Sequence, residues 1–365
     1  MKIAQLLYSG FGGTATVAFS LVDASDKIDW SMLFYGVEPL EENYRKRCAE
    51  KGIDCQFYHK KRVGFFDNSN YKKIEQALTV IAPDAIICHL PSLVFIARKY
   101  CNKNPLTKLV AVEHHALHLK KTKDWILSLL LMRQADKVVY LSEFYRDKIK
   151  EKIGRFFKEE KAAVVPNGVN TQIFKPIDEN KLSPIFAIGM MGRLVDGKDF
   201  ETIIEAVALL NNQGEKIQFL IAGDGPKMQQ LENLVSEKRL ENSVVFLGWL
   251  AEDQLIEYLN GLDVYIHSTA GETINTSVMQ AMAMELPVLV SDVPEVNKMV
   301  IHGVSGFLFE KGDANELAEQ LMLFMSNKNL IKVMGKQARE KAIKDYSAVR
   351  MLAQYIECFG ENLPA

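Results

Sequence analysis

An arginine and a lysine in one loop are the leading candidates for chemistry in this chain. Arg193 and Lys198 follow the apolar run 186–191, which is typical of a strand. A guanidinium offers phosphate oxygens a planar fork, and an ammonium offers a compact point charge. Because open α/β sheets bind ligands at the carboxyl ends of their strands, the pair is suited to a diphosphate. Taken alone, such a pair in a loop is more often merely solvated.

A second polar group opens the segment 271–287, which lies between two apolar runs that predict strands. Glu272 comes first, and the following residues are expected in or near the first turns of a helix: Asn275, Thr276, Ser277 and Gln280. Backbone N–H groups in a first helical turn have no partner within the helix, and the helix dipole favours an anion there. The alternative is an ordinary buried helix after a strand.

Glycines follow predicted strands at two further places. Gly12 and Gly13 close a turn after the run 2–8, and Gly223 and Gly225 flank an aspartate after a later run. Glycine lets a ligand or a neighbouring segment approach the backbone closely, although a tight turn without ligand has the same composition. The spacing after the first strand is not GxGxxG, so nicotinamide binding is not indicated.

Two histidines, His114 and His115, follow the predicted strand 109–112. A lone histidine is usually structural, but a doublet at the end of a strand favours contact with a ligand. The sequence leaves open which of the two makes that contact.

The pattern of elements predicts a doubly wound α/β protein, because apolar runs typical of strands alternate with helical patterns throughout. With 365 residues the chain exceeds what one core usually serves, so two domains are expected. The turn-rich stretch 166–170, followed by Phe174 and Pro176, is the predicted connector.

Composition excludes several classes of protein. The five cysteines form no CxxC pair, which argues against a zinc site or a disulfide framework. The first residues lack a signal-peptide pattern, and no apolar run approaches the roughly 20 residues of a membrane span. Basic residues prevail in the first half and acidic ones in the second, which suits either an anionic acceptor or two solvated surfaces.

The polar motifs together resemble retaining glycosyltransferases of family 4, the glycosyl transferases group 1. The resemblance is carried by Glu272, the stretches 281–283 and 286–288, the Arg193–Lys198 pair, the PNGV text at 166–169 and the GDGP text at 223–226. The family's second glutamate is Gln280 here, and Pro294 replaces a usual glycine. An amide lacks the charge-assisted strength of a carboxylate, so the departure at Gln280 bears on donor affinity or nucleotide choice.

The resemblance implies the GT-B fold, in which two doubly wound Rossmann-like domains face each other across a cleft. On this basis residues 1–174 are an acceptor-side domain, residues 175–345 bind the nucleotide sugar, and residues 346–365 form a helix that crosses back.

The activity implied is transfer of a sugar from a nucleotide-diphosphate sugar to a glycan or lipid-linked acceptor, in assembly of a cell-surface polysaccharide. In the family such transfer is retaining and needs no metal or other cofactor. The resemblance assigns Arg193 and Lys198 to the leaving phosphates, Glu272 to the sugar hydroxyls and His114 to the donor sugar. It assigns the remaining residues to donor or nucleotide binding: Gly12, Gly13, Gly223, Gly225, Asn275, Thr276, Ser277 and Gln280. Nucleic acid is not an expected partner.

A cytoplasmic enzyme is expected, with contact to the inner face of the plasma membrane as a further hypothesis. Lysines at 120, 121 and 123 precede Trp125 and a leucine-rich run, and a basic cluster at 60–62 precedes Phe65 and Phe66. Such stretches suit a helix at a membrane interface. A basic loop leading into a buried helix explains the same residues and is slightly favoured.

Three other functions fit parts of the pattern. The same fold hosts nucleotide-sugar epimerases, which need no acceptor. A noncatalytic partner subunit of a transferase would account for Gln280. A nicotinamide dehydrogenase is the default for a doubly wound chain, but the sequence lacks its glycine fingerprint.

Overall fold

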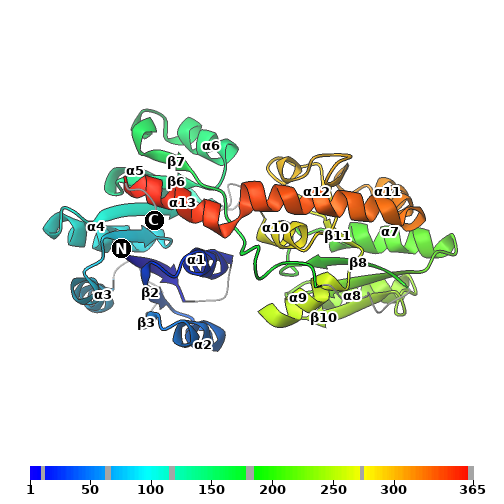
Figure 1. Cartoon of the computed structure of the whole chain (residues 1–365), viewed down its shortest axis with the longest axis horizontal. Helices are drawn as coiled ribbons and strands as arrows, with labels where there is room; N and C mark the ends of the chain where they lie inside the picture. The colour runs from blue at the N-terminus through cyan, green and yellow to red at the C-terminus, as the bar shows by residue number, and fades with distance from the viewer. Residues whose placement is uncertain (10–12, 62–66, 115–119, 178–184, 272–274, 361–365) are drawn as a thin grey trace. The chain divides into compact units, whose positions relative to one another are not determined.

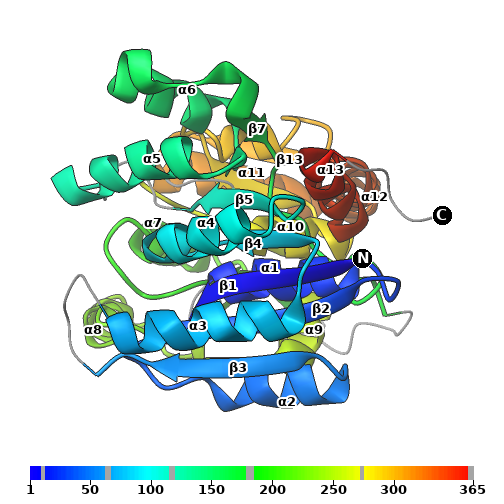
Figure 2. The same ribbon diagram turned by 90° about the vertical axis from the view of Figure 1, so that its left-hand side faces the viewer.

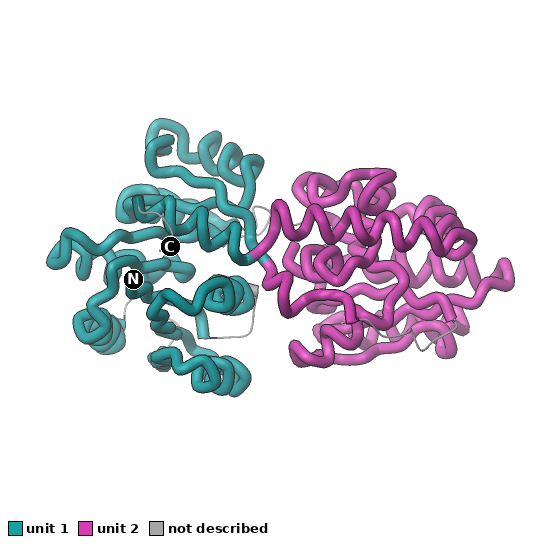
Figure 3. Tube along the Cα trace, viewed as in Figure 1, with its two compact units in different colours: residues 1–168, 348–365 teal, residues 169–347 magenta. Residues whose placement is uncertain are grey.

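The computed structural model describes residues 1–9, 13–61, 67–114, 120–177, 185–271 and 275–360. Within them the chain forms two compact units, which Figure 3 distinguishes by colour. Unit 1 comprises Met1–Gly168 and the segment that begins at Ala348, and unit 2 comprises Val169–Ser347.

The change of unit after Gly168 comes earlier than the predicted domain end at residue 174. Packing is the reason, because the side chains of Val169 and Phe174 are buried in a core of unit 2. Tyr346 is buried in the same core, so the return to unit 1 falls at Ala348 instead of residue 346.

Unit 1 is a seven-stranded sheet of order β3-β2-β1-β4-β5-β6-β7, and all its neighbouring strands are parallel. Its strands are β1 Lys2–Tyr8, β2 Asp29–Gly36, β3 Asp54–His59, β4 Ala85–Cys88, β5 Lys108–Glu113, β6 Lys137–Tyr140 and β7 Ala162–Val164. Its helices are α1 Gly13–Asp23, α2 Glu42–Glu50, α3 Asn68–Ile81, α4 Val94–Lys103, α5 Thr122–Gln134, α6 Glu143–Ile153 and α13 Ala348–Phe359. Figure 1 labels these elements.

Helices cover both faces of this sheet, which explains why its strands are apolar at nearly every position. On β1, Ile3 and Leu7 pack in a core with α1, α2 and α13, whereas Ala4 and Leu6 pack in a core with α3, α4, α5 and α6. α3 and α4 run side by side on their face (Figure 2). The alternation follows from the two-residue period of a strand.

The last described helix, α13, completes the core of unit 1 although it follows unit 2 in the sequence. Five of its residues, Met351, Leu352, Tyr355, Ile356 and Phe359, are at most 2% exposed. Their spacing of three and four residues forms one apolar stripe, which packs in the core shared with α1 and β1.

Unit 2 is a six-stranded parallel sheet of order β10-β9-β8-β11-β12-β13. Its strands are β8 Phe186–Met191, β9 Ile217–Ala222, β10 Val244–Gly248, β11 Val264–His267, β12 Val288–Ser291 and β13 Gly306–Phe309. Its helices are α7 Phe200–Asn212, α8 Met228–Glu237, α9 Glu252–Asn260, α10 Thr276–Ala283, α11 Ala314–Ser326 and α12 Lys328–Tyr346.

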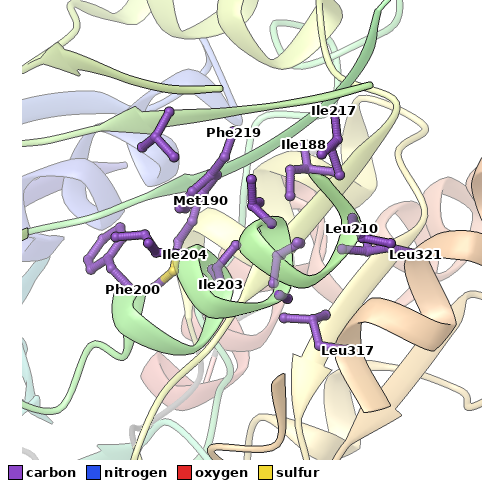
Figure 4. Packing of buried hydrophobic residues seen from close by; sticks show 14 of the residues in the cluster. Ile188, Met190, Phe200, Ile203, Ile204, Leu210, Ile217, Phe219, Leu317 and Leu321 are labelled. Carbon is purple, nitrogen blue, oxygen red and sulfur yellow. The ribbon is translucent and has the colours of Figure 1, made fainter. Parts of the chain in front are cut away.

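Figure 4 shows the core on one face of this sheet, where Phe200 and Ile204 of α7 pack near Met190 and Phe219 of the strands. The other face is covered by α9, α10 and the second half of α12. α10 has six consecutive buried residues, from Val278 to Ala283, so it is enclosed on all sides, as the sequence predicts.

α10 lies against α12 through a close backbone contact. Gly335 of α12 has no side chain, and a Cβ there would overlap the carbonyl oxygen of Glu285. Four residues further along α12, Arg339 donates hydrogen bonds to the carbonyl of Ala283, at the end of α10, and to that of Phe174, 3.2 Å away. The guanidinium therefore stabilises the carboxyl end of α10, where a helix favours positive charge.

We predict that Gly335→Ala lowers the free energy of unfolding by about 1–3 kcal/mol, the usual cost of forcing extra volume into a packed site. At a helical position with open space the same substitution raises the free energy of unfolding, so the sign of the change tests whether the close contact exists. Urea denaturation measures it. The control is Gly261→Ala at the end of α9, where φ is −78° and the new Cβ would lie 3.4 Å from the nearest atom. Equal effects of the two substitutions would contradict the prediction.

Candidate active site

In each sheet the first strand lies in the interior. The next strands are added on one side of it and the later strands on the other, which creates a topological switch point beside the first strand. In unit 2 the first strand, β8, lies between β9 and β11, and the connections from β8 and β11 lead to helices on opposite faces. The crevice at the carboxyl ends of two such strands is where doubly wound sheets bind ligands. The loop after β8 and the start of α10 after β11 both lie at this edge.

The loop after β8 is held by the loops on both sides of it. On one side the N–H of Gly192 donates to the carbonyl of Ala222, and that of Leu194 donates to Asp224, each at 2.9 Å. On the other side the carbonyl of Gly197 accepts a hydrogen bond from the N–H of Ala270 at 2.8 Å. Three backbone hydrogen bonds to neighbouring loops thus fix the loop that carries Arg193 and Lys198.

Gly223 and Gly225 let the loop after β9 approach this loop closely. Both have positive φ, and a Cβ on either would overlap a carbonyl oxygen, that of Gly192 for residue 223 and that of Leu194 for residue 225. No other residue fits at these two positions without displacing the backbone. The two glycines therefore serve loop packing, whatever else they contact.

Lys198 and Arg193 differ in how they are held. The backbone of Lys198 forms an isolated bridge with Thr269, and its Nζ would lie 3.7 Å from a Cβ placed on Gly192, so the side chain folds back along the start of the loop. The next residue, Asp199, accepts a hydrogen bond from Ser268 and caps α7 through the N–H of Thr202. Arg193 is exposed, and within the described ranges no carboxylate pairs with it.

The start of α10 differs from the open anion site that the sequence predicts. Asn275 is the N-cap, and its Oδ1 accepts hydrogen bonds from the N–H groups of Ser277 at 2.8 Å and Val278 at 3.4 Å. The prediction that these first-turn donors lack an internal partner is wrong, because the Asn275 amide occupies them. The N–H of Thr276 and the helix dipole remain available to an anion.

Tyr265 connects the start of α10 to the end of β8. Its fully buried hydroxyl donates to Ser277 Oγ at 2.8 Å and accepts from the N–H of Met191 at 3.2 Å. Ser277 Oγ in turn donates to Asn275 Oδ1 at 2.5 Å. One chain of hydrogen bonds therefore sets the distance between the residue before Gly192 and the first turn of α10.

Gln280 lies one turn along the same helix. Because residues three and four apart share a helix face, its side chain lies on the side of Thr276 and Ser277. It is 7% exposed, and its amide makes no hydrogen bond with any residue that the structure describes. Its amide atoms are not among the fully buried atoms that lack a partner, so the amide keeps some access to solvent and is suited to receive a ligand.

Of the residues predicted to contact the donor, Gly12, His115 and Glu272 lie outside the described residues, as do Arg62, Phe65 and Phe66 of the predicted membrane-facing stretch. Gly13 is the first residue of α1. For the remaining predicted site residues of unit 2, the structure brings the loop after β8, the loop after β9 and the first turns of α10 to one edge of the sheet.

In unit 1, His114 follows β5 and is the end of a hydrogen-bonded chain of three side chains. Its Nε2 lies 2.9 Å from Nδ1 of His89, which follows β4. His89 Nε2 lies 3.0 Å from Oε1 of Gln5 on β1. Gln5 Nε2 donates to the carbonyl of Ala18 on α1 at 3.1 Å. Gln5 and His89 are buried, and the two imidazole rings are stacked with their centroids 5.2 Å apart.

Burial keeps both imidazoles of this chain uncharged near neutral pH. It lowers the pKa of His114 to about 4. Burial, and then the proximity of His114, lowers the pKa of His89 well below its usual value. At neutral pH each ring therefore carries one N–H donor and one acceptor nitrogen.

Lys120, which the sequence groups with a membrane-facing cluster, is an interior residue. Its side chain is 0% exposed, and its Nζ lies 3.0 Å from a carboxylate oxygen of Glu113. Ser128 on α5 donates to the other oxygen of Glu113 at 2.7 Å, and the ammonium lies 5.1 Å from the ring centroid of Trp125. This burial differs from both sequence interpretations, which place Lys120 in a basic loop. A fully desolvated ammonium needs a carboxylate partner, which Glu113 provides.

The sequence interpretation missed Gln5, His89 and Tyr265. A signal existed for the first two, since Gln5 is the one polar residue inside the apolar run 3–7 and His89 directly follows the run 85–88. Tyr265 has no such signal, because a tyrosine in a strand is ordinary core composition.

Family models match both units. The model described as Glycosyltransferase Family 4 matches residues 11–173, and the model described as Glycosyl transferases group 1 matches residues 171–341. The chain belongs to the group 1, family 4 glycosyltransferases. The family that the sequence motifs suggest is confirmed.

Curated relatives of this glycosyltransferase match it at low identity. An uncharacterised glycosyltransferase of Methanocaldococcus jannaschii is 26% identical over 69% of this chain and 68% of its own. The capsular polysaccharide biosynthesis glycosyltransferase CapM of Staphylococcus aureus is 25% identical over 61% of each chain. An Escherichia coli enzyme, UDP-Gal:alpha-D-GlcNAc-diphosphoundecaprenol alpha-1,3-galactosyltransferase, is 26% identical over 61% of this chain and 57% of its own. The match thus spans less than two thirds of the last two relatives.

Solved structures establish the fold of this glycosyltransferase. Anabaena HepE in complex with UDP-glucose has a TM-score of 0.83 at 19% identity and matches over 99% of both chains. A glycosyltransferase from Rickettsia africae has a TM-score of 0.79 at 16% identity over 98% of this chain and 97% of its own. The fold is GT-B, built from two Rossmann-like units, as expected from the sequence.

Two features are absent from the described residues. No described helix of this glycosyltransferase combines the length and apolar character that a membrane crossing requires. Nor do three or more His, Cys, Asp or Glu side chains gather around a possible metal position in the part of the chain that the structure describes.

We predict that Asn275→Ala lowers the free energy of unfolding by about 1 kcal/mol, because three donors at the start of α10 lose their acceptor. Asn275→Asp is the matched control, since its carboxylate retains the accepting oxygen. Urea denaturation of the two variants measures the difference. If both are destabilised equally, capping by Oδ1 is not what holds the first turn of α10.

Proposed function

We propose that this glycosyltransferase moves a sugar from a nucleotide-diphosphate sugar to a glycan or lipid-linked acceptor, with retention of the anomeric configuration and without a metal. The proposal depends on one observation above all. The loop with Arg193 and Lys198 and the start of α10 lie together at the switch point of the second sheet.

The difficult step in such a transfer is departure of the diphosphate while positive charge grows on the anomeric carbon. Fixed cations and N–H donors aimed at the leaving oxygens lower this barrier. Arg193 has no carboxylate partner among the described residues, so its guanidinium is suited to a bidentate contact with phosphate. Lys198 follows in a loop that three backbone hydrogen bonds to its neighbours hold in place, which reduces the reorganisation needed when charge develops.

Other residues have narrower roles in this proposal. Gln280, which is 7% exposed and shares a helix face with Thr276, is suited to bind the ribose of the nucleotide. Glu272 is assigned to hydroxyls of the donor sugar, and His114 is assigned to the same sugar. Gly12 and Gly13 are assigned to the donor as positions where a ligand can approach the backbone.

A UDP-sugar is the donor that the comparisons favour. Anabaena HepE, which has the same fold, binds UDP-glucose, and the E. coli relative uses UDP-Gal. CapM and the E. coli enzyme act in capsular polysaccharide biosynthesis and on a diphosphoundecaprenol-linked sugar, respectively. By analogy we propose a growing polysaccharide or its lipid-linked precursor as the acceptor here.

We predict that Arg193→Ala and Lys198→Ala each reduce turnover at least about 100-fold, because each removes a cation that stabilises the leaving diphosphate. The assay follows release of nucleoside diphosphate from a panel of UDP-, GDP- and ADP-sugars, with and without a lipid-linked sugar acceptor. Unfolding midpoints of both variants are expected to match the parent protein.

The control for this prediction is Lys238→Ala, which removes a lysine of the same unit that pairs with Glu205 on the surface at 2.7 Å. It is expected to leave turnover within about twofold, since an exposed ion pair contributes little. Unchanged turnover in both Arg193→Ala and Lys198→Ala would overturn the proposed mechanism.

Removal of divalent metals is predicted to leave the transfer rate unchanged, because protein cations neutralise the leaving group. The measurement is the initial rate after dialysis against EDTA, compared with the rate after magnesium or manganese is restored. A rate that collapses in EDTA and recovers with a divalent ion would contradict this part of the proposal.

A further inference from the structure

The three-residue chain in unit 1 has a direction that its chemistry fixes. The carbonyl oxygen of Ala18 only accepts hydrogen bonds, so the Gln5 atom that faces it, 3.1 Å away, must be the NH2 group. The other amide atom, the oxygen Oε1, therefore faces His89. This orientation follows from the partner and not from the similar sizes of nitrogen and oxygen.

The orientation of Gln5 determines the tautomer of each histidine in turn. Because Oε1 of Gln5 only accepts, Nε2 of His89 carries the proton and donates to it. A neutral His89 then has a lone pair on Nδ1. His114 Nε2, 2.9 Å from that lone pair, must carry a proton and donate it. The remaining nitrogen of His114, Nδ1, is left as an acceptor.

We propose that Gln5 and His89 are positioning residues that hold His114 in its Nε2–H tautomer, so that His114 offers its ligand an acceptor nitrogen. Two structural facts support the inference. Gln5 and His89 are buried at 0% and 4% exposure, so water does not compete for their hydrogen bonds. In addition, Nδ1 of His114 has no hydrogen-bond partner among the residues that the structure describes.

The acceptor nitrogen of His114 limits which ligand groups this residue can bind. That this ligand is the donor sugar rests on the proposed function. An acceptor nitrogen pairs with a group that donates a hydrogen bond, such as a sugar hydroxyl. It repels a carboxylate or a phosphate oxygen, because both present lone pairs of their own. His114 is therefore suited to orient an uncharged, hydroxyl-bearing part of a sugar and is unsuited to bind the diphosphate.

The direct test is the tautomeric state of the histidines in the full chain. Protein labelled with ¹⁵N-histidine is examined at neutral pH by long-range ¹H–¹⁵N correlation, and signals are assigned with His89→Gln and His114→Gln. We expect the Nε2–H pattern for both His89 and His114. An Nδ1–H pattern for His114, or a charged ring, would overturn the proposal whether or not the protein is active with a given substrate.

Two variants of His89 separate positioning from packing. An asparagine places its carbonyl oxygen where Nδ1 of His89 stands and keeps an acceptor for His114. A glutamine places its amide near the position of Nε2 and loses that acceptor while it keeps the contact with Gln5. We expect turnover of UDP-glucose, or of the best donor in the panel, to be about tenfold lower in His89→Gln than in His89→Asn, the effect of one unmade hydrogen bond.

The outcomes distinguish this inference from the proposed function. Equal turnover in the two variants, together with an unchanged His114 signal in His89→Gln, would overturn the positioning role. Absence of any sugar transfer, together with the expected tautomers, would overturn the proposed function but leave the positioning of His114 by Gln5 and His89 supported. Gln5→Met provides a check without a substrate, since loss of its oxygen is expected to convert His89 and His114 into tautomer mixtures in the same spectra.

Discussion

The parallel arrangement of β9, β8 and β11 is the constraint on which the site in unit 2 depends. Parallel strands end at one edge, so three consecutive loops must share a narrow space. Gly223 and Gly225 resolve the crowding, because their missing side chains let one loop lie directly on the carbonyl oxygens of the next. Tyr265 fixes the third partner by joining the end of β8 to α10. The residues that carry charge are therefore presented by backbone that has little freedom to move.

In unit 1, hydrogen bonds between side chains connect the carboxyl ends of the strands, whereas in unit 2 close contacts between backbone loops do so. Gln5 lies on β1, and His89 and His114 directly follow the neighbouring strands β4 and β5, so that one chain of hydrogen bonds joins the three strands. A buried polar network of this kind is costly when incomplete and rigid when complete. The Glu113–Lys120 ion pair adds a second desolvated contact, made by the residue directly before His114 and by the residue six positions after it.

Much of this structure could be predicted from the sequence, and the failures have physical causes. Strands that are buried on both faces appear in the sequence as continuous apolar runs, so nearly every strand and the α/β class could be predicted. The short strand β13 was missed because it directly follows a glycine-rich loop. Helix α6 was missed because its residues 143–153 are mostly charged and only three of its side chains are buried.

At the site, motifs identified residues but not their partners. The spacing of Arg193 and Lys198 indicated a phosphate loop. At the start of α10 the prediction overlooked that asparagine is itself a preferred N-cap residue, which occupies N–H groups of its own helix. His89 and Gln5 are separated by 84 positions in the chain. Contacts of that range depend on strand order, which a single sequence does not specify. Lys120 illustrates the same limit, since composition alone suggested a surface residue.

The position of α13 in the sequence has a consequence for synthesis on the ribosome. Domains usually fold in the order in which they are translated. Here the apolar stripe of α13 fills a core of unit 1, yet the ribosome makes it only after all of unit 2. The part of unit 1 that α13 covers, next to α1 and β5, therefore stays exposed to water until the second unit has been translated.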